Sequence, residues 1–334
     1  MRVLVTGVTG FLGGRVAEGL VSAGHAVRGL VRDPGRWASR PPEAEAVQGD
    51  VTDAASFLRA ARGSQAIVHC AALVKVWVRD RREFDRTNLE GLKHAVDAAR
   101  EARARLVYTS SFIALGPTDG RVFDEDTPRL VGRFHNDYER TKWLADQLAR
   151  QVAADGFPIV RLYPGIAYGP GASTPGNHVV RLLLQHARGS LPGMLGRGDR
   201  RMCFAYVDDV VKGFVAALER APLGSGYVLG GENRTTRELF DAFQKASGVA
   251  PPTRRIPFWA AAMAGKLKRW RAELTGVEPD VTDQVVGIYR HDWAYSSARA
   301  ERELNYRITP FQDGIRETTE WLRKIGELPP STGT

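Results

Sequence analysis

A tyrosine and a lysine stand four residues apart, at Tyr138 and Lys142, near the start of a segment with helical periodicity. Residues with this spacing lie on one face of a helix. A tyrosine hydroxyl has a pKa near ~10, and an ammonium group close to it favours the phenolate and brings the pKa nearer to neutral pH. The pair therefore predicts proton transfer to or from a substrate oxygen, although the same spacing also arises in ordinary surface pairs on helices.

A serine that ends a predicted strand supports this interpretation. Ser111 follows the strand-like run 105–109, and open α/β folds bind ligands at the carboxyl edge of the sheet. Its hydroxyl can donate a hydrogen bond to the reacting oxygen and hold it for transfer of a proton and a hydride. The alternative is a hydroxyl that only satisfies backbone groups at the end of the strand.

Three glycines at three-residue intervals, Gly7, Gly10 and Gly13, stand between a strand-like run and a helical segment. The first permits a tight turn out of the strand, the second lets the backbone approach a pyrophosphate, and the third allows the helix to pack on the sheet. The helix N-terminus supplies amide groups and the positive end of the helix dipole. The segment predicts a dinucleotide-binding turn, with a purely structural glycine turn as the alternative.

The elements that position these residues alternate between β-branched runs and helical patterns. We expect strands at 3–6, 26–31, 66–70, 106–109, 159–162 and 227–229, and helices at 13–23, 87–101 and 236–246. The alternation predicts an α/β fold, a Rossmann-type doubly wound parallel sheet with a smaller C-terminal substrate-binding lobe. Residues 1–163, with 203–222 returning to them, would form the dinucleotide-binding domain, 164–202 and 223–330 the substrate-binding lobe, and 331–334 a tail.

The composition narrows the class of protein. The chain has 334 residues and a net charge of +9, but its 47 basic and 38 acidic residues are interspersed, which indicates a solvated surface and no nucleic-acid partner. Cys70 and Cys203 give neither a disulfide framework nor metal-ligand spacing, so no metal is expected. The sequence contains no recognisable signal peptide and no run of 18 apolar residues. We therefore expect a cytoplasmic protein without a transmembrane segment.

In this order the motifs resemble an extended short-chain dehydrogenase/reductase of the NAD-dependent epimerase/dehydratase type, over nearly the whole chain. The resemblance is carried by residues 6–13, 87–91, 109–111, 138–142, 168–170, 206–210, 229–232 and 303–306. It implies that Ser111, Tyr138 and Lys142 are the catalytic triad, that Lys142 also bonds the nicotinamide ribose, and that Asn88 braces the site. It also implies a homodimer formed by the helices around 88–100 and 138–153.

The expected cofactor contacts combine the glycine turn, the ends of neighbouring strands, the catalytic pair and the segment after residue 163. They are Gly7, Thr9, Gly10, Phe11, Leu12, Gly13, Arg32, Asp50, Val51, Ala71, Ala72, Asn88, Thr109, Tyr138, Lys142, Pro164, Gly165 and Ile166.

The end of the second predicted strand bears on the choice between NADP and NAD. Extended members of this superfamily usually carry an acid where this chain has Val31, and Arg32 follows it. An acid would bond the ribose 2'-hydroxyl, whereas an arginine can pair bidentately with a 2'-phosphate. NADP is therefore favoured, and NAD remains the alternative if Asp33 turns towards the ribose.

Two further positions bear on the substrate. Nucleotide-sugar enzymes of this family tend to hold the diphosphate with an asparagine and an arginine where this chain has Ile166 and Met202, although Arg201 stands beside the latter. The departures resemble the branch of dihydroflavonol reductases, 3-beta-hydroxysteroid dehydrogenases and hopanoid-associated epimerase-like proteins. That branch implies a small, apolar or aromatic carbonyl compound or secondary alcohol as the substrate.

Aromatic residues at Trp77 and Trp259 offer surface for such a pocket, although both can equally be ordinary packing residues. The segment 256–272, which carries Lys266, Lys268 and Arg269, is expected to form a lid. The alternative is a segment that lies on a membrane surface.

The sequence thus predicts an NADP-dependent oxidoreductase with a Ser-Tyr-Lys mechanism. One alternative is an NAD-dependent sugar epimerase or dehydratase that oxidises and re-reduces one substrate. Another is a non-catalytic, NADP-sensing regulator on the same fold, against which the intact Ser111, Tyr138 and Lys142 argue.

Overall fold

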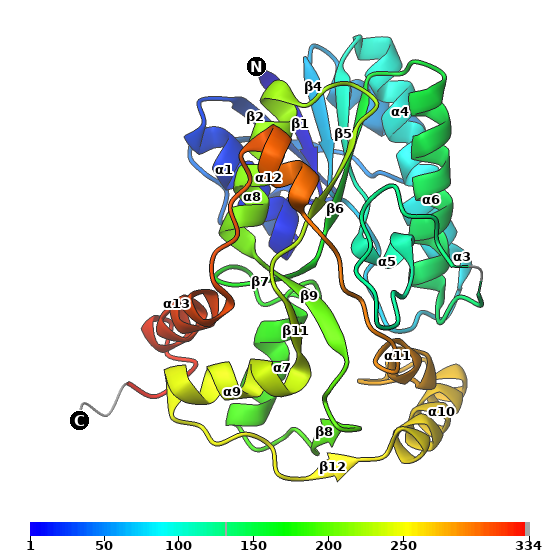
Figure 1. Ribbon diagram of the computed structural model, residues 1–334. Coiled ribbons are helices and arrows are strands. Elements are labelled where there is room, and N and C mark those ends of the chain that lie inside the picture. The colour runs from blue at the N-terminus through cyan, green and yellow to red at the C-terminus, as the bar shows by residue number, and fades with distance from the viewer. Residues whose placement is uncertain (131, 331–334) are drawn as a thin grey trace.

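Seven parallel strands form the central sheet of this computed structural model, which describes residues 1–130 and 132–330 (Figure 1). Their order across the sheet is β10-β6-β5-β4-β1-β2-β3. The strands are β1 (Arg2–Thr6), β2 (Ala26–Val31), β3 (Glu45–Gln48), β4 (Ala66–His69), β5 (Arg105–Thr109), β6 (Ile159–Pro164) and β10 (Gly226–Leu229). The tail expected at 331–334 lies outside the described residues.

Helices cover both faces of this sheet. On one face α1 (Phe11–Ser22) packs with α8 (Val207–Arg220), and on the other lie α2 (Ala54–Ala61), α4 (Gly91–Ala102) and α6 (Asp137–Ala154). Strand β4 is buried over its whole length, as expected for a parallel sheet between two helical layers. The predicted α/β class with a Rossmann-type doubly wound sheet is confirmed.

The direction of the chain across the sheet reverses beside β1. From β1 the chain moves outward through β2 and β3, and it then returns to the other side of β1 as β4 and continues through β5 and β6. Ligands of open α/β sheets bind at the carboxyl ends of the strands at such a point. The glycine turn after β1 and the segment after β4 therefore meet where a dinucleotide is expected.

A smaller lobe lies beyond the carboxyl ends of the large sheet (Figure 1). It contains the sheets β11-β9-β7 and β12-β8. Its strands are β7 (Ile166–Tyr168), β8 (Met194–Leu195), β9 (Arg201–Tyr206), β11 (Asn233–Thr235) and β12 (Arg255–Ile256), and its helices are α7 (His178–Ala187), α9 (Thr236–Ser247), α10 (Phe258–Thr275), α11 (Asp283–Ile288) and α13 (Phe311–Lys324). The remaining elements are η1 (Pro34–Trp37), α3 (Arg82–Phe84), η2 (Asp85–Glu90), α5 (Phe112–Leu115) and α12 (Ala298–Leu304).

The predicted elements agree with the observed ones to within two residues at each end. The helix expected at 87–101 begins as the π-helical turn η2 and continues as α4. Strand β3 was not predicted, because this short edge strand is partly exposed and lacks an apolar run. Among the described residues, no helix combines the length and the apolar composition needed to cross a membrane.

Two strands depart from the expected division of the chain. Strand β10 was expected within the substrate-binding lobe at 223–330, but it pairs in parallel with β6 and closes one edge of the large sheet. Strand β9 includes residues 203–206, which were expected to return to the dinucleotide-binding domain, but it pairs with β7 and β11 in the lobe. The assignment of the two lobes to cofactor and substrate stays a prediction.

Candidate active site

The glycine turn has the geometry that close approach of the backbone requires. Gly7 adopts a φ of 76°, and a Cβ atom there would lie 2.8 Å from the Ala71 amide nitrogen. A Cβ atom on Gly13 would lie 2.7 Å from the carbonyl carbon of Gly7 and closer still to its oxygen. Gly7 thereby lets the segment after β4 lie against the turn, and Gly13 lets the first turn of α1 lie against Gly7.

The N-terminus of α1 fits a pyrophosphate. Gly10 is the N-cap residue of this helix, and a glycine offers no side-chain oxygen to the first amides, which stay available to an anion. The Phe11 side chain is buried in the core beside Gly171. A cofactor would therefore meet the backbone amide of Phe11, while Leu12 packs partly against the same core.

At the end of β2, the structure separates the two residues that compete for the ribose. Arg32 is exposed. The Asp33 side chain caps η1 by accepting a hydrogen bond from the Gly35 amide at 3.0 Å. The Asp50 carboxylate also has partners within its own loop, since its Oδ1 accepts hydrogen bonds from the amide and the hydroxyl of Thr52. Among Arg32, Asp33 and Asp50, the two carboxylates thus accept hydrogen bonds from neighbouring residues, and Arg32 points its charge to solvent.

Ser111 and Tyr138 come together at the carboxyl edge of the sheet. Ser111 follows β5 and is the N-cap of α5, where its hydroxyl accepts from the Ile113 amide at 3.4 Å. Tyr138 lies in the first turn of α6, which Asn136 caps by accepting a hydrogen bond from the Glu139 amide. Burial raises the pKa of Tyr138 to about 12, while a hydrogen bond with the Ser111 side chain works in the opposite direction. The phenol is therefore protonated at neutral pH.

Lys142 is held one helical turn further along α6. Its Nζ donates a hydrogen bond to the Thr109 carbonyl oxygen at 2.7 Å and contacts the Tyr108 hydroxyl at 3.4 Å. Burial lowers the pKa of Lys142 to about 8, against the opposing effect of the Asp146 carboxylate. The sequence led us to expect that Lys142 lowers the pKa of Tyr138, but burial of the phenol dominates that pKa.

Asn88 connects two of the segments that carry these residues. This buried residue lies in η2, and its Oδ1 accepts a hydrogen bond from the Leu73 amide at 2.7 Å. Its Nδ2 donates to the hydroxyl of Thr141, the neighbour of Lys142, at 3.0 Å. Asn88 thereby ties the segment after β4 to α6, and the π-helical turn that carries it is a distortion often found at functional sites.

Sequence reasoning missed a buried carboxylate below the lysine. Asp146 is 1% exposed, accepts a hydrogen bond from Ser110 at 3.1 Å and is paired with Arg150 at 2.7 Å. It follows Lys142 by four residues, so the helical spacing that paired Tyr138 with Lys142 could also have identified it.

Glu139 was missed for a different reason. This fully buried carboxylate pairs with Arg129 and His135. Both partners come from the irregular segment before α6, whose path the sequence pattern does not reveal. The contacts fix the start of the helix that carries Tyr138.

The segment after β6 borders the same edge of the sheet. A Cβ atom on Gly165 would lie 3.1 Å from the Cys203 sulfur, so Gly165 sits tightly against β9. Ile166 packs partly against the apolar core of the smaller lobe, and Met202 is 2% exposed within that core. Arg201 is directed elsewhere, because its guanidinium donates to the Arg121 carbonyl oxygen at 3.2 Å.

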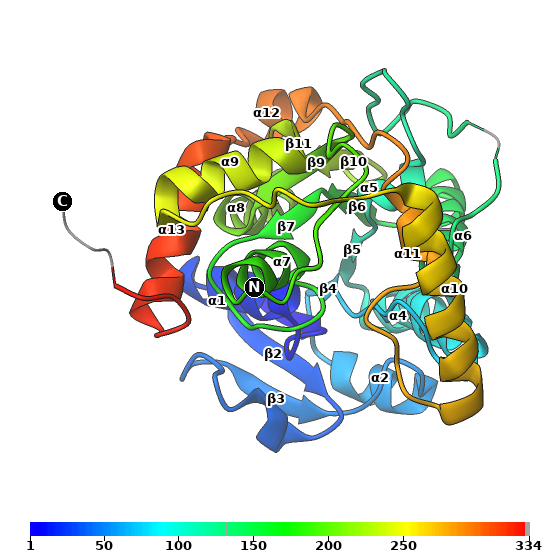
Figure 2. The ribbon, with the colours of Figure 1, turned by 90° about the horizontal axis from the view of Figure 1, so that it is seen from below.

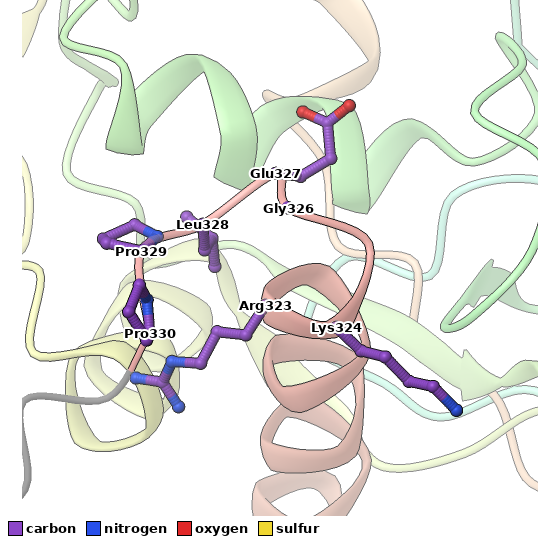
Figure 3. Close-up of a pocket in the computed structure, with 7 residues that line it drawn as sticks. All are labelled: Arg323, Lys324, Gly326, Glu327, Leu328, Pro329 and Pro330. Carbon is purple, nitrogen blue, oxygen red and sulfur yellow. The ribbon is translucent and has the colours of Figure 1, made fainter.

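Two surface hollows are lined by none of the candidate site residues described above. One, at the end of α13, is lined by Arg323, Lys324, Gly326, Glu327, Leu328, Pro329 and Pro330 (Figure 3). Two of its charged groups have other partners, since Arg323 donates to the Ala246 carbonyl oxygen and Glu327 pairs with Arg188. The other is lined by Val122, Gly231, Glu232, Asn233, Arg234, Tyr295, Ser296, Ser297, Glu301 and Ile308.

Comparison with known proteins identifies the family. A model of the NAD dependent epimerase/dehydratase family matches residues 3–230. A putative dihydroflavonol 4-reductase from Synechocystis sp. is 27% identical over 96% of this chain and 94% of its own length. The 3 beta-hydroxysteroid dehydrogenase/Delta 5-->4-isomerase of Mycobacterium tuberculosis is 31% identical over 91% of this chain and 85% of its own length.

A solved structure agrees with this assignment. The UDP-glucose 4-epimerase of Thermus thermophilus, in complex with NAD, is 25% identical and superposes with a TM-score of 0.74 over 97% of this chain and 99% of that one. The chain therefore belongs to the NAD-dependent epimerase/dehydratase family and is an NAD(P)-dependent oxidoreductase of the extended short-chain dehydrogenase/reductase type.

Proposed function

We propose that the protein transfers a hydride between NADP and the carbonyl carbon or secondary alcohol carbon of a small apolar or aromatic compound. The observation that carries the proposal is the placement of Ser111 and Tyr138 together at the carboxyl edge of the sheet, with Lys142 one helical turn further along α6. This set combines a proton donor, a second donor to the same oxygen and a cation at the sheet edge where dinucleotides bind.

Each member of the set has a distinct role in reduction. The bound dihydronicotinamide supplies the hydride. Ser111 donates a hydrogen bond to the carbonyl oxygen and holds it in place. Tyr138, protonated at neutral pH, delivers its proton to that oxygen. Lys142 binds the ribose and stabilises the phenolate that the proton transfer leaves behind.

Two apolar residues and the named relatives support an apolar substrate. Ile166 and Met202 are apolar where nucleotide-sugar enzymes tend to carry polar groups for the diphosphate, and both pack in or against the core of the smaller lobe. A diphosphate would lose charge-assisted hydrogen bonds worth about 1.5–3 kcal/mol each. The two relatives are named for a dihydroflavonol and a steroid, which are polycyclic compounds with little charge.

The function is tested by following NADPH oxidation with a panel of flavonoid, steroid and simple aromatic ketones, and with UDP-glucose as the nucleotide sugar. We expect consumption of NADPH with at least one apolar ketone and none with the sugar. Epimerisation of the sugar without net consumption of NADPH would contradict the proposal. Binding of NADPH without turnover of any carbonyl compound would instead favour a sensor.

Arg32 is expected to determine the preference for NADP. Arg32→Ala should raise the KM for NADPH by about 10- to 100-fold, because the 2'-phosphate loses a charge-assisted pair, and should leave the KM for NADH almost unchanged. The control is Arg59→Ala, which removes an exposed arginine from the last turn of α2. Equal changes for both cofactors, or a wild-type preference for NADH, would contradict the assignment.

The two reaction directions should respond differently to pH. Because the pKa of Tyr138 is about 12, the phenolate that accepts the alcohol proton is scarce and increases about tenfold per pH unit below that value. From pH 6 to 8, kcat/KM for alcohol oxidation should therefore rise about 100-fold, whereas kcat/KM for ketone reduction should stay nearly constant. Parallel profiles in the two directions would rule out Tyr138 as the acid and base.

A homodimer through α4 and α6 is part of the proposal. Leu144 and Leu148 lie on one face of α6 and are only half-buried in the single chain. Such residues suit a helical interface between two copies. Light scattering of the wild-type chain should give twice the monomer mass, and a monomer would contradict this part of the proposal.

A further inference from the structure

Helix α10 presents an apolar stripe to solvent. Five of its large apolar side chains are 59% to 70% exposed, and they are Trp259, Met263, Leu267, Trp270 and Leu274. An amphipathic helix of a globular protein normally turns such a stripe towards the core. Figures 1 and 2 show α10 along the outside of the molecule, with α11 between it and the rest of the smaller lobe.

Close packing on the opposite side fixes this orientation. Gly265 and Ala272 are the buried residues of α10. A Cβ atom on Gly265 would lie 2.6 Å from the carbonyl carbon of Thr282 and closer still to the amide of Asp283. At about 100° per residue, the exposed apolar side chains lie on the face opposite Gly265. The helix cannot turn this face inward without separating from α11.

Basic residues flank the apolar stripe. Lys266 lies on one side of it and Arg271 on the other, and both are exposed. Lys268 pairs with Asp280, and Arg269 pairs with Asp283. The helix itself carries Glu273 as its acidic residue. Its exposed face therefore combines an apolar centre with positively charged margins.

The end of α10 is fixed to the segment that borders the active site. Val277, which is 68% exposed, continues the apolar surface past the helix C-terminus. Lys75, in the segment after β4, pairs with Glu278 at 2.8 Å. Arg81, further along that segment, pairs with Asp137 at the start of α6. These ion pairs connect the segment that follows α10, through the segment after β4, to the first turn of α6, which carries Tyr138.

We propose that α10 docks the protein peripherally on a bilayer that contains anionic lipids, with the apolar stripe inserted at the interface and Lys266 and Arg271 at the headgroups. Tryptophan and leucine on one face with basic residues beside them are the features of a helix that lies in the interface plane. Each lysine or arginine near an anionic surface adds electrostatic attraction.

A second copy of the chain fits this surface less well than a bilayer does. In a twofold contact through the stripe, the basic margins of the two helices would face each other, with one glutamate on each helix to offset them. The packing that holds α10 outward also differs from that of a lid, since the stripe faces away from α11 and the smaller lobe. The lid expected at 256–272 and the pocket role of Trp259 are therefore not supported, because Trp259 is 70% exposed.

Flotation of the full-length chain with lipid vesicles tests the proposal without any need for turnover, so its failure is distinct from failure of the proposed function. We expect the chain to float with vesicles of phosphatidylcholine and phosphatidylglycerol, and to float at least about ten times less with phosphatidylcholine alone. Tryptophan fluorescence should shift to the blue on binding, and Trp259→Phe with Trp270→Phe should remove most of that shift. Absence of flotation with both kinds of vesicle would overturn the proposal.

Two variants separate the contributions of the stripe and its margins. In the triple variant Met263→Ser, Leu267→Ser and Leu274→Ser, the fraction of protein that floats should fall at least about tenfold. In the double variant Lys266→Glu and Arg271→Glu, flotation with anionic vesicles should be lost. The matched control is Leu223→Ser, because Leu223 is 59% exposed and lies outside α10. Flotation of the triple variant equal to that of wild type would overturn the proposal. So would a fall in mass of the triple variant in light scattering, which would assign the stripe to a second copy.

Discussion

Tyr138→Phe is expected to lower kcat for ketone reduction by about 10²- to 10⁴-fold, the usual contribution of a positioned proton donor. The substitution removes one hydroxyl and keeps the ring, which packs partly against the apolar core of the smaller lobe. The fold and the affinity for NADPH should therefore be preserved. The measurements are kcat and KM with an apolar ketone, Kd for NADPH and the melting temperature.

The control for this substitution is Tyr227→Phe. Tyr227 lies on β10, and its hydroxyl donates a hydrogen bond to Glu303 of α12 at 2.9 Å. The substitution therefore removes a tyrosine hydroxyl outside the proposed catalytic set. We expect its kcat to stay within about twofold of wild type. A Tyr138→Phe enzyme that retains near wild-type kcat would show that another group delivers the proton.

Gly13→Ala is expected to reduce both stability and cofactor affinity. The new Cβ atom would meet the carbonyl group of Gly7 at distances that backbone atoms cannot tolerate. Separating α1 from the turn should lower the free energy of unfolding by about 1–3 kcal/mol. It should also weaken NADPH binding by about 10- to 100-fold, since one amide hydrogen bond to a charged phosphate contributes about 1.5–3 kcal/mol.

A second glycine in a helical conformation provides the control. Gly91 begins α4, and a Cβ atom there would make ordinary contacts, the nearest at 3.6 Å to Val51. Gly91→Ala should therefore leave NADPH affinity unchanged and should be neutral or stabilising by up to about 1 kcal/mol. The comparison uses chemical denaturation and titration of NADPH fluorescence. Equal behaviour of the two variants would mean that Gly13 is not required by the turn.

The parts of the site that sequence could predict are encoded locally. The glycine turn, the serine at the end of β5 and the spacing of Tyr138 and Lys142 each depend on a few neighbouring residues. Parallel strands place their carboxyl ends at one edge of the sheet, so a prediction of the sheet alone is enough to bring these segments together. The structure accordingly places Ser111, at the end of β5, and Tyr138, in the first turn of α6, at the same edge of the sheet.

The parts that could not be predicted depend on partners far away in the sequence. The Thr109 carbonyl that holds Lys142 and the Arg129 that pairs with Glu139 become neighbours only when β5 and the irregular segment before α6 fold against that helix. The pKa of Tyr138 is set by burial, which spacing on a helix does not report. The expected effect of the Lys142 ammonium on the pKa of Tyr138 was therefore too large.

Side-chain exposure was the other source of error. Residues 258–275 contain aromatic and aliphatic side chains that a sequence can assign equally to a core, a lid or a surface. The close contact of Gly265 with Thr282 and Asp283 determines which of these is correct, because it directs the small residues of α10 inward and leaves the large apolar ones at the surface. Strand β10 illustrates the same limit, since its apolar run does not say which sheet it joins.

The transfer of deuterium from C4-deuterated NADPH to substrate tests the central claim most directly. With an apolar ketone that wild type reduces, we predict that the alcohol product carries one deuterium at the carbinol carbon for each NADPH consumed when the label occupies the transferred position. Tyr138→Phe should slow this transfer together with NADPH consumption. Consumption of NADPH with an unlabelled product for both C4 epimers, or conversion of a nucleotide sugar without net consumption, would contradict the account.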